Sequence, residues 1–236
     1  MARILITAGP TYEPIDAVRF IGNRSSGKLG SNLADRAEQL GWEVRILLGP
    51  NAETPKEPGV DVVRFASAQD LEDALGQHLA WCDCLVMAAA VADYRPKACE
   101  VDCEGKRRRT GDDLSIALES TPDLLAGCSK DARPNQLLVG FALEPADELE
   151  ASALRKLVKK DIDLIVANPL DTMDADSIDA RLIGNTEHDI QFDQNTNGPI
   201  RKDAFASWLL GHLDTLVQTR LHNPRTNTES PSHVAL

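Results

Sequence analysis

The chain has 236 residues, of which 42% are hydrophobic and 26% charged, and its formal net charge is −12. This length and composition suffice for a substantial core in one large domain or two small ones. The acidic balance disfavours nucleic acid and anionic membranes as partners, so any bound anion must meet locally gathered positive charge. The apolar run at residues 4–8 is too short for a signal peptide or a membrane span, and an odd number of cysteines favours reduced thiols, so we expect a cytoplasmic protein.

Short apolar runs alternate with amphipathic segments along the chain. In chain order, the pattern predicts strands at residues 3–8, 43–48, 61–66, 84–87, 137–142 and 162–166, and helices at 27–40, 70–80, 147–160 and 202–221. Apolar runs separated by such helices are typical of a parallel sheet that is covered on both faces. We therefore expect an α/β fold with a doubly wound, Rossmann-like, mainly parallel sheet. One domain is expected over residues 1–221, and a polar tail at 222–236 has the composition of a disordered segment.

Two stretches interrupt this alternation. Residues 97–118 carry charge and turn residues and end in an alternating polar–apolar pattern, which predicts a β arm. The runs 180–183 and 188–192 predict a hairpin across Gly184 and Asn185. In open parallel sheets, ligands bind outside the carboxyl ends of the strands. The loops after residues 8, 87, 142 and 166 are therefore the places to look for a site.

The segment GNRSSGKLG at residues 22–30 has the glycine and lysine spacing of a P-loop. Leu29 stands where a P-loop has its Mg²⁺-binding hydroxyl, and the loop after the first strand lacks GxGxxG. The segment instead predicts a helix amino terminus whose N–H groups hold an anion. The phosphate- or substrate-binding residues that this implies are Ser25, Ser26, Gly27 and Lys28. Simple helix capping by one of the serines is the alternative.

Several side chains near the expected strand ends could contact a nucleotide. Asp93 could accept hydrogen bonds from a sugar or a base, and Phe141 could stack on a base; a turn aspartate and core packing are the alternatives. Lys156 and Lys160 share one helix face, as a triphosphate clamp or as a solvated basic face.

Two further features have simple structural explanations. Thr121 is expected to cap a helix that begins at Pro122, a role that needs no ligand. Lys106 opens the basic run 106–109 in the expected arm, where it is either solvated or a cation for a polyphosphate.

Taken together, five segments resemble the bacterial phosphopantothenate–cysteine ligase family: AGPTYEPIDAVRFIGNRSSGKLG, AAAVADYRP, KRRRTGDDLSIALESTPDLL, VGFALE and LRKLVKKDIDLIVAN. The resemblance covers about residues 3–168 and extends more loosely to 221. In many bacteria this ligase is the second half of a bifunctional protein whose first half is a flavin-dependent decarboxylase.

The resemblance implies a reaction of coenzyme A biosynthesis that joins 4′-phosphopantothenate to L-cysteine. The carboxylate attacks the α-phosphate of CTP in the presence of Mg²⁺, giving an acyl-cytidylate and pyrophosphate, and the cysteine amine then displaces CMP. The resemblance also implies a homodimer in which the arm of one subunit completes the site of the other. It further suggests association with a phosphopantothenoylcysteine decarboxylase.

Individual roles follow from the resemblance. Asn23 matches the asparagine that turns over the acyl-nucleotide, and Lys106 matches the lysine of the first half-reaction. The nucleotide-binding residues that it implies are Met87, Ala88, Ala89, Asp93, Thr121, Pro122, Asp123, Leu124, Phe141, Lys156 and Lys160. Extra residues before Lys106 leave open which basic residue of the run acts, and the sequence identifies neither the metal ligands nor a preference for CTP over ATP. A nucleotide-binding oxidoreductase and a catalytically inactive nucleotide-binding protein are the alternatives.

Overall fold

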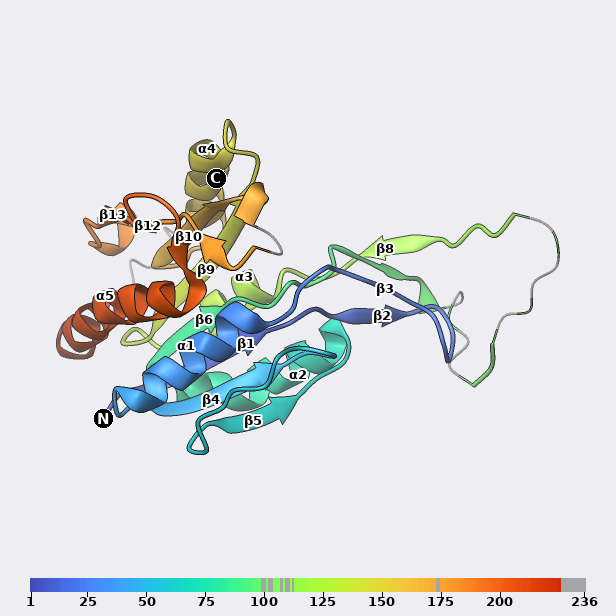
Figure 1. The fold of residues 1–236 in the computed structure, drawn as a ribbon, viewed down its shortest axis with the longest axis horizontal. Helices are drawn as coiled ribbons and strands as arrows, with labels where there is room; N and C mark the ends of the chain where they lie inside the picture. Colours follow the sequence, from blue (N-terminus) through green and yellow to red (C-terminus); the bar gives the residue numbers. More distant parts are fainter. Residues whose placement is uncertain are drawn as a thin grey trace, which may run out of the picture.

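The computed structural model describes residues 1–98, 101, 104–106, 108, 111, 113–172 and 175–225. Its centre is an eight-stranded sheet with the strand order β13-β12-β10-β9-β6-β1-β4-β5 (Figure 1). The strands of this sheet are β1 (Arg3–Ala8), β4 (Glu43–Leu48), β5 (Asp61–Arg64), β6 (Cys84–Met87), β9 (Leu137–Glu144), β10 (Leu164–Pro169), β12 (Arg181–Gly184) and β13 (Asp193–Asn195).

Six neighbouring strands, from β10 to β5, pair in parallel, and β12 and β13 add an antiparallel edge. The expected mainly parallel, Rossmann-like sheet is thus confirmed. The chain passes from β1 to β4 on one side and later returns to β6 on the other side of β1. The strand order therefore reverses between β1 and β6, which is where such sheets bind ligands.

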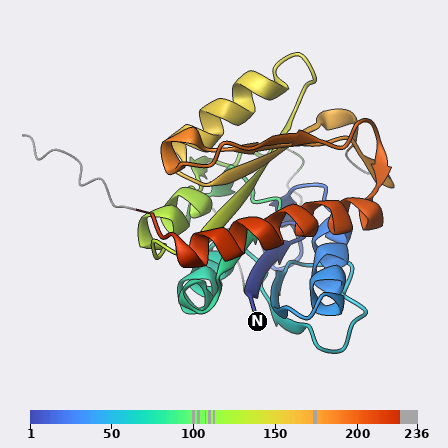
Figure 2. The ribbon, with the colours of Figure 1, turned by 90° about the vertical axis from the view of Figure 1, so that its left-hand side faces the viewer.

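Helices cover both faces of the sheet (Figure 2). They are α1 (Lys28–Gln39), α2 (Ala68–His78), α3 (Leu124–Asp131), α4 (Leu149–Lys159) and α5 (Lys202–His222). Alternate side chains of β1 enter opposite cores: Ile4 and Ile6 pack with α1 and α5, whereas Leu5 packs with α2, α3 and α4. Among the helices of the described residues, none combines the length and apolar character that a bilayer crossing requires.

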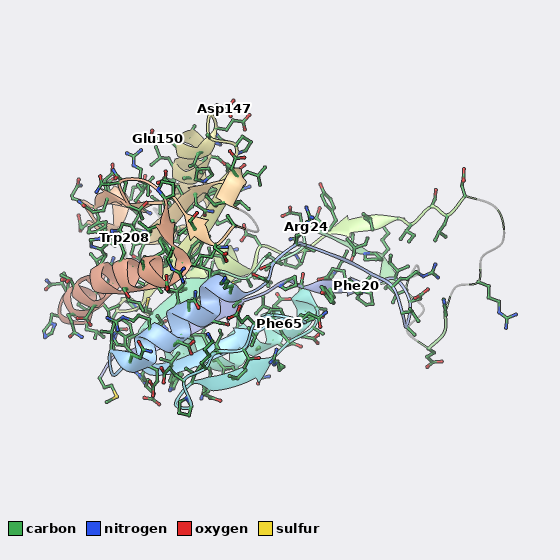
Figure 3. All side chains as sticks on the ribbon, in the orientation of Figure 1. Phe20, Arg24, Phe65, Asp147, Glu150 and Trp208 are labelled. Atoms are coloured by element: carbon green, nitrogen blue, oxygen red, sulfur yellow. The ribbon has the colours of Figure 1, made fainter. Side chains whose placement is uncertain are left out.

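A β arm extends from one side of the sheet (Figure 1). It contains β7 (Tyr94–Pro96) paired with β8 (Leu118–Ser120), and the Lys97 N–H donates to the Ala117 carbonyl at 3.0 Å. The sequence predicted this arm but missed its second ribbon, β2 (Tyr12–Pro14) paired with β3 (Phe20–Gly22). Figure 3 shows Phe20 on the arm and Arg24 between the arm and the sheet.

The predicted hairpin across Gly184 and Asn185 is wrong. Asn185 instead caps a short 3-10 helix, Thr186–His188, through a hydrogen bond from the Glu187 N–H (3.0 Å), and its side-chain amide donates to the Ile162 carbonyl (2.9 Å). The run 188–192 is consequently a connection, and β12 pairs with β13.

One predicted helix cap is wrong, and the capping alternative for the 22–30 segment is not found. Asp123, not Thr121, caps α3, because its carboxylate accepts from the Ala126 N–H at 3.1 Å. Neither serine caps α1, whose N-cap is Gly27 in a left-handed conformation (φ 68°).

A short antiparallel pair and the last helix complete the domain. β11 (Ser177–Ile178) pairs with β14 (Ile200–Arg201), which leads directly into α5. Residues 223–225 of the expected tail are ordered: the Arg225 N–H donates to the Pro134 carbonyl (2.9 Å), and its guanidinium pairs with Asp163. The rest of that tail, 226–236, lies outside the described residues.

Candidate active site

The loops that follow β1 and β6 are held together by two buried threonines. Thr7 Oγ1 accepts from the Ala89 N–H and Thr11 Oγ1 accepts from the Ala92 N–H, each at 3.0 Å. Both threonines are completely buried, so their hydroxyls serve the backbone of the loop after β6 rather than solvent. These two hydrogen bonds hold the loop at the carboxyl edge of the sheet, beside the reversal of strand order.

A cavity of about 360 Å³ opens at this edge; we call it the lysine cavity. Its lining residues are Met87, Ala89, Val91, Ala92, Asp93, Thr121, Pro122, Asp123, Leu124, Leu125, Phe141, Lys156 and Lys160. Residues from β6, α3, β9 and α4 thus converge on one hollow. Of the residues that the sequence assigned to a nucleotide, all but Ala88 line it.

Each lysine of the lysine cavity is paired with a carboxylate. Lys156 Nζ lies 2.6 Å from Glu144 Oε1, and Lys160 Nζ lies 2.5 Å from Asp123 Oδ2. The hydrogen bond from Lys156 lowers the pKa of Glu144. Burial acts to raise the pKa of Asp123, but the hydrogen bonds from Lys160 and from the Ala126 N–H outweigh it and lower that pKa. Both carboxylates are therefore ionised at neutral pH and hold the lysines at the cavity wall.

Thr121 contributes a polar atom to the same cavity. Its backbone N–H donates to the Asp93 carbonyl at 2.9 Å, which fixes the turn before α3. Its Oγ1 is buried and has no hydrogen-bond partner among the described residues. A buried hydroxyl without a partner is costly, so this atom is a candidate for a ligand contact.

A second cavity of about 240 Å³ adjoins the first; we call it the loop cavity. Its lining residues are Arg24, Ser25, Ser26, Gly27, Lys28, Leu29, Gly30, Ala88, Ala89, Ala90, Phe141, Leu143, Asn168, Thr172, Ile178 and Lys202. All four predicted phosphate-binding residues are in this set, and Ala89 and Phe141 line both cavities. The two hollows therefore share a wall at the end of β6 and β9.

Glycine is required where the loop cavity meets the sheet. A Cβ on Gly27 would lie 2.5 Å from Ala52 Cβ, and the residue has φ 68°. The loop therefore approaches its neighbours more closely than any other residue would allow.

Sequence reasoning missed the members of the loop cavity that come from β10 and the start of α5, Asn168 and Lys202. Asn168 lies just after residue 166, at a strand end that the sequence singled out, but no role was assigned to it. No local motif marks Lys202, and the fold brings both residues to the 22–30 loop.

The two residues predicted to be catalytic line neither cavity. The Asn23 side chain donates to the Val91 carbonyl at 2.9 Å, so it is anchored to a residue of the lysine cavity. Lys106 is exposed in the arm, next to Gly105, whose carbonyl accepts from the Ala17 N–H at 3.0 Å. The structure thus places the Asn23 side chain beside the lysine cavity and leaves Lys106 on the arm.

Comparison with known proteins assigns the fold to a family. The model of the DNA/pantothenate metabolism flavoprotein C-terminal domain matches residues 1–215. The chain belongs to this family. The membership confirms the resemblance that the sequence motifs indicated.

Relatives of the chain carry two kinds of name. A cysteine/cysteine sulfinic acid decarboxylase from an unknown prokaryotic organism is 43% identical over 168 residues, covering 71% of this chain and 46% of that protein. The coenzyme A biosynthesis bifunctional protein CoaBC of Mycobacterium tuberculosis is 39% identical over 223 residues, covering 89% and 53%. The chain spans about half the length of these curated relatives. A crystal structure of the C-terminal domain of a CoaBC protein is 35% identical, with a TM-score of 0.76 over 92% of this chain and 96% of that one.

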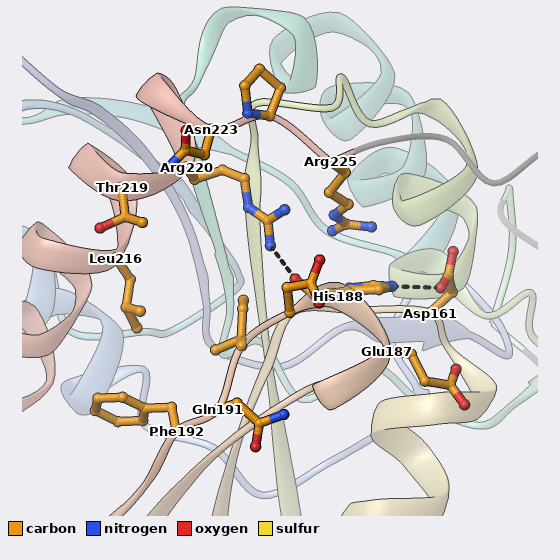
Figure 4. Close-up of a pocket in the computed structure, with 13 residues that line it drawn as sticks. Asp161, Glu187, His188, Gln191, Phe192, Leu216, Thr219, Arg220, Asn223 and Arg225 are labelled. Carbon is orange, nitrogen blue, oxygen red and sulfur yellow. Dashed lines mark hydrogen bonds and ion pairs between the residues drawn. The ribbon is translucent and has the colours of Figure 1, made fainter.

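A larger cavity, about 610 Å³, lies at the other edge of the sheet (Figure 4). Its wall includes His188, Arg220 and Arg225, which surround the completely buried Asp163 at the amino end of β10. Burial acts to raise the pKa of Asp163, but the hydrogen bond with His188 and the charges of both arginines outweigh it and lower that pKa. These cations neutralise a carboxylate that is completely buried, so we assign the cluster to stability.

Among the described residues, no group of three or more His, Cys, Asp or Glu side chains is arranged to hold a metal ion. Cys82, Cys84 and Cys128 are buried free thiols, and burial raises the pKa of each. Cys99 and Cys103 lie outside the described residues.

Proposed function

We propose that the chain catalyses the ligation of 4′-phosphopantothenate to L-cysteine through an acyl-cytidylate, with CTP as the nucleotide and Mg²⁺ as its counter-ion. The observation that carries the proposal is the pair of adjoining cavities, one lined by Lys156 and Lys160 and the other by the 22–30 loop. A reaction between a carboxylate and a triphosphate needs two anionic ligands side by side. The CoaBC names of the relatives support the same reaction and do not favour an oxidoreductase.

The lysine cavity suits the first half-reaction. The carboxylate oxygen attacks the α-phosphorus, the bond to the β-phosphate oxygen breaks, and negative charge grows on the departing pyrophosphate. Lys156 and Lys160, held by Glu144 and Asp123, are fixed point charges that can stabilise this oxygen without first losing their orientation. Phe141, on the shared wall, would pack against the base while the loop cavity holds phosphoryl oxygens.

The second half-reaction joins nitrogen to carbon. The cysteine amine attacks the acyl carbon, the bond to the cytidylate oxygen breaks, and the amine proton leaves with CMP or water. Asn23 would orient the acyl-nucleotide, because its amide is fixed to the Val91 carbonyl beside the lysine cavity. A neutral amide can position the adduct without drawing the amine proton.

Magnesium would be held mainly by triphosphate oxygens. Mg²⁺ keeps several waters and takes only one or two carboxylates at nucleotide sites. The lysine cavity offers two such carboxylates, Asp93 and Asp123, the latter already shared with Lys160. This donor set fits an ion that arrives with its nucleotide, where it would neutralise part of the phosphoryl charge.

A second subunit would bring Lys106 to the site. Large apolar side chains of the arm are exposed: Val18, Phe20, Tyr94, Leu114 and Leu118. An apolar surface of this kind on an extension supports a protein partner, which we propose is a second copy of the chain. In that homodimer, Lys106 would neutralise the developing charge of the first half-reaction. The association with a decarboxylase stays a prediction.

The test is pyrophosphate release in mixtures of phosphopantothenate, cysteine, Mg²⁺ and either CTP or ATP. Turnover that requires all three substrates and prefers CTP is the expected result. Asn23→Ala should release about one pyrophosphate per site and accumulate the acyl-nucleotide, whereas Lys106→Ala should release almost none. Lys97→Ala, another exposed lysine of the arm, is the matched control and should behave as the unmodified protein. No pyrophosphate release with either nucleotide would refute the proposal.

A further inference from the structure

Asp176 places a carboxylate beside the cations of the loop cavity. Its Oδ1 lies 2.5 Å from Lys28 Nζ, and its carbonyl accepts from the Lys202 N–H at 3.1 Å. Lys28 and Lys202 both line the cavity, although they are far apart in the sequence. The hydrogen bond and charge of Lys28, followed by the charges of Arg201 and Lys202, lower the pKa of Asp176. An anion is thus already present where the loop meets the start of α5.

This ion pair is exchangeable. The Asp176 side chain is 86% exposed and that of Lys28 is 37% exposed, so both groups can recover hydration when they separate. Exposed pairs of this kind contribute little to stability, because solvent screens both charges. A phosphoryl group carries more charge than a carboxylate and offers three acceptor oxygens, so it competes well for the same ammonium group.

The neighbouring pairs of the lysine cavity differ in burial. The carboxylates of Glu144 and Asp123 are 22% and 42% exposed, and each has a second hydrogen bond, from Ser152 and from the Ala126 N–H. Asp176 Oδ1 has no comparable second donor among the hydrogen bonds of the described residues. Of these three carboxylates, that of Asp176 can therefore separate most easily from its lysine.

We propose that Asp176 is an internal counter-ion that the ligand displaces: a phosphoryl group takes its place beside Lys28, and Lys202 is a second cation for that group. The inference rests on the proposed function and deepens it by naming two residues for phosphoryl recognition. Asp176 then sets the affinity of the loop cavity, since each binding event must first break its ion pair.

The phosphoryl group can come from either substrate, because CTP and 4′-phosphopantothenate share this chemistry. Titration calorimetry of the full chain with each compound separately distinguishes the two sources. Asp176→Asn preserves shape and removes the charge, so it should lower the Kd of one compound about two- to five-fold at low salt, in line with an exposed ion pair. Lys202→Met should weaken binding of that same compound.

Two controls isolate the ion pair. Asp171→Asn removes an exposed acid from the same segment and reports the general loss of negative charge, so it should leave the Kd nearly unchanged. In a Lys28→Met background, Asp176→Asn should no longer tighten binding. An unchanged or weaker affinity of Asp176→Asn, or tightening that persists without Lys28, would overturn the inference, whereas the proposed function is tested separately by pyrophosphate release from the unmodified protein. If the unmodified protein neither binds these compounds nor turns over, the proposed function fails, and the inference fails with it.

Discussion

Replacing Asp163 with asparagine should destabilise the protein strongly without affecting ligand binding. The carboxylate is completely buried, accepts the Leu138 N–H at 2.7 Å and pairs with Arg220 at 2.8 Å and with Arg225. These contacts join β9, the end of α5 and residues 223–225. Removing one partner of a buried charge network leaves the others uncompensated, at a cost of about 3–5 kcal/mol. That is a large part of the roughly 5–15 kcal/mol that stabilises a typical domain.

Urea unfolding at pH 7 measures this loss, and Asp161→Asn is the matched control. Asp161 contacts the same His188, at 2.8 Å, but its side chain is 70% exposed, so its loss should cost at most about 1 kcal/mol. The pKa of Asp163 is lower in the folded protein than in the unfolded chain. The stabilisation that its carboxylate provides is therefore complete above the unfolded-state pKa and is lost as the pH falls through the folded-state pKa. The difference between Asp163→Asn and the unmodified protein should therefore shrink below about pH 4. Equal losses for the two variants at pH 7, or a difference that grows in acid, would refute the assignment.

Three further predictions concern single side chains. Thr121→Val removes the hydroxyl that lacks a partner, so unfolding free energy should stay level or rise, while nucleotide affinity measured by calorimetry should fall; a loss of stability would contradict this. Gly30→Ala places a methyl group against the end of β1 and should cost about 1–3 kcal/mol in urea unfolding. Gly211→Ala in α5 meets nothing within 4 Å and should not destabilise. Burial raises the pKa of Cys82 and of Cys128 to about 12, so mass spectrometry should find both unmodified by a thiol reagent at pH 8 in the native protein; rapid labelling would contradict it.

Much of the fold follows from local patterns. Runs such as 84–87 are apolar on both faces, which only a sheet covered on both sides can bury, and the intervening helices impose parallel pairing. The ribbon of β2 and β3 could not be predicted this way, because it is short and exposed and its stacked rings, Tyr12 and Phe20, are ordinary in a loop. The hairpin prediction was wrong because Asn185 caps a short 3-10 helix. Its side chain also donates to the Ile162 carbonyl, a contact between distant segments that the local sequence does not reveal.

The sequence predicted which residues belong to the candidate site better than it predicted how they are arranged in space. The resemblance identified most members of the lysine cavity but not Val91, Ala92 and Leu125. Local pattern alone predicted Thr121 as a helix cap, whereas Asp123 is the cap and Thr121 lines the cavity. The loop cavity draws Asn168 and Lys202 from distant segments, which no spacing rule reveals. Lys106 is exposed on the arm and lines neither cavity, so its place at the site rests on the proposed pairing of two chains.

We infer that the lysine cavity and the loop cavity together hold a triphosphate. A crystal structure of the protein soaked with CTP and Mg²⁺ tests it most directly. We predict the base against Phe141 and the phosphates between Lys160 and the 22–30 loop. A nucleotide bound instead between Arg220 and Arg225, at the opposite edge of the sheet, would contradict the account.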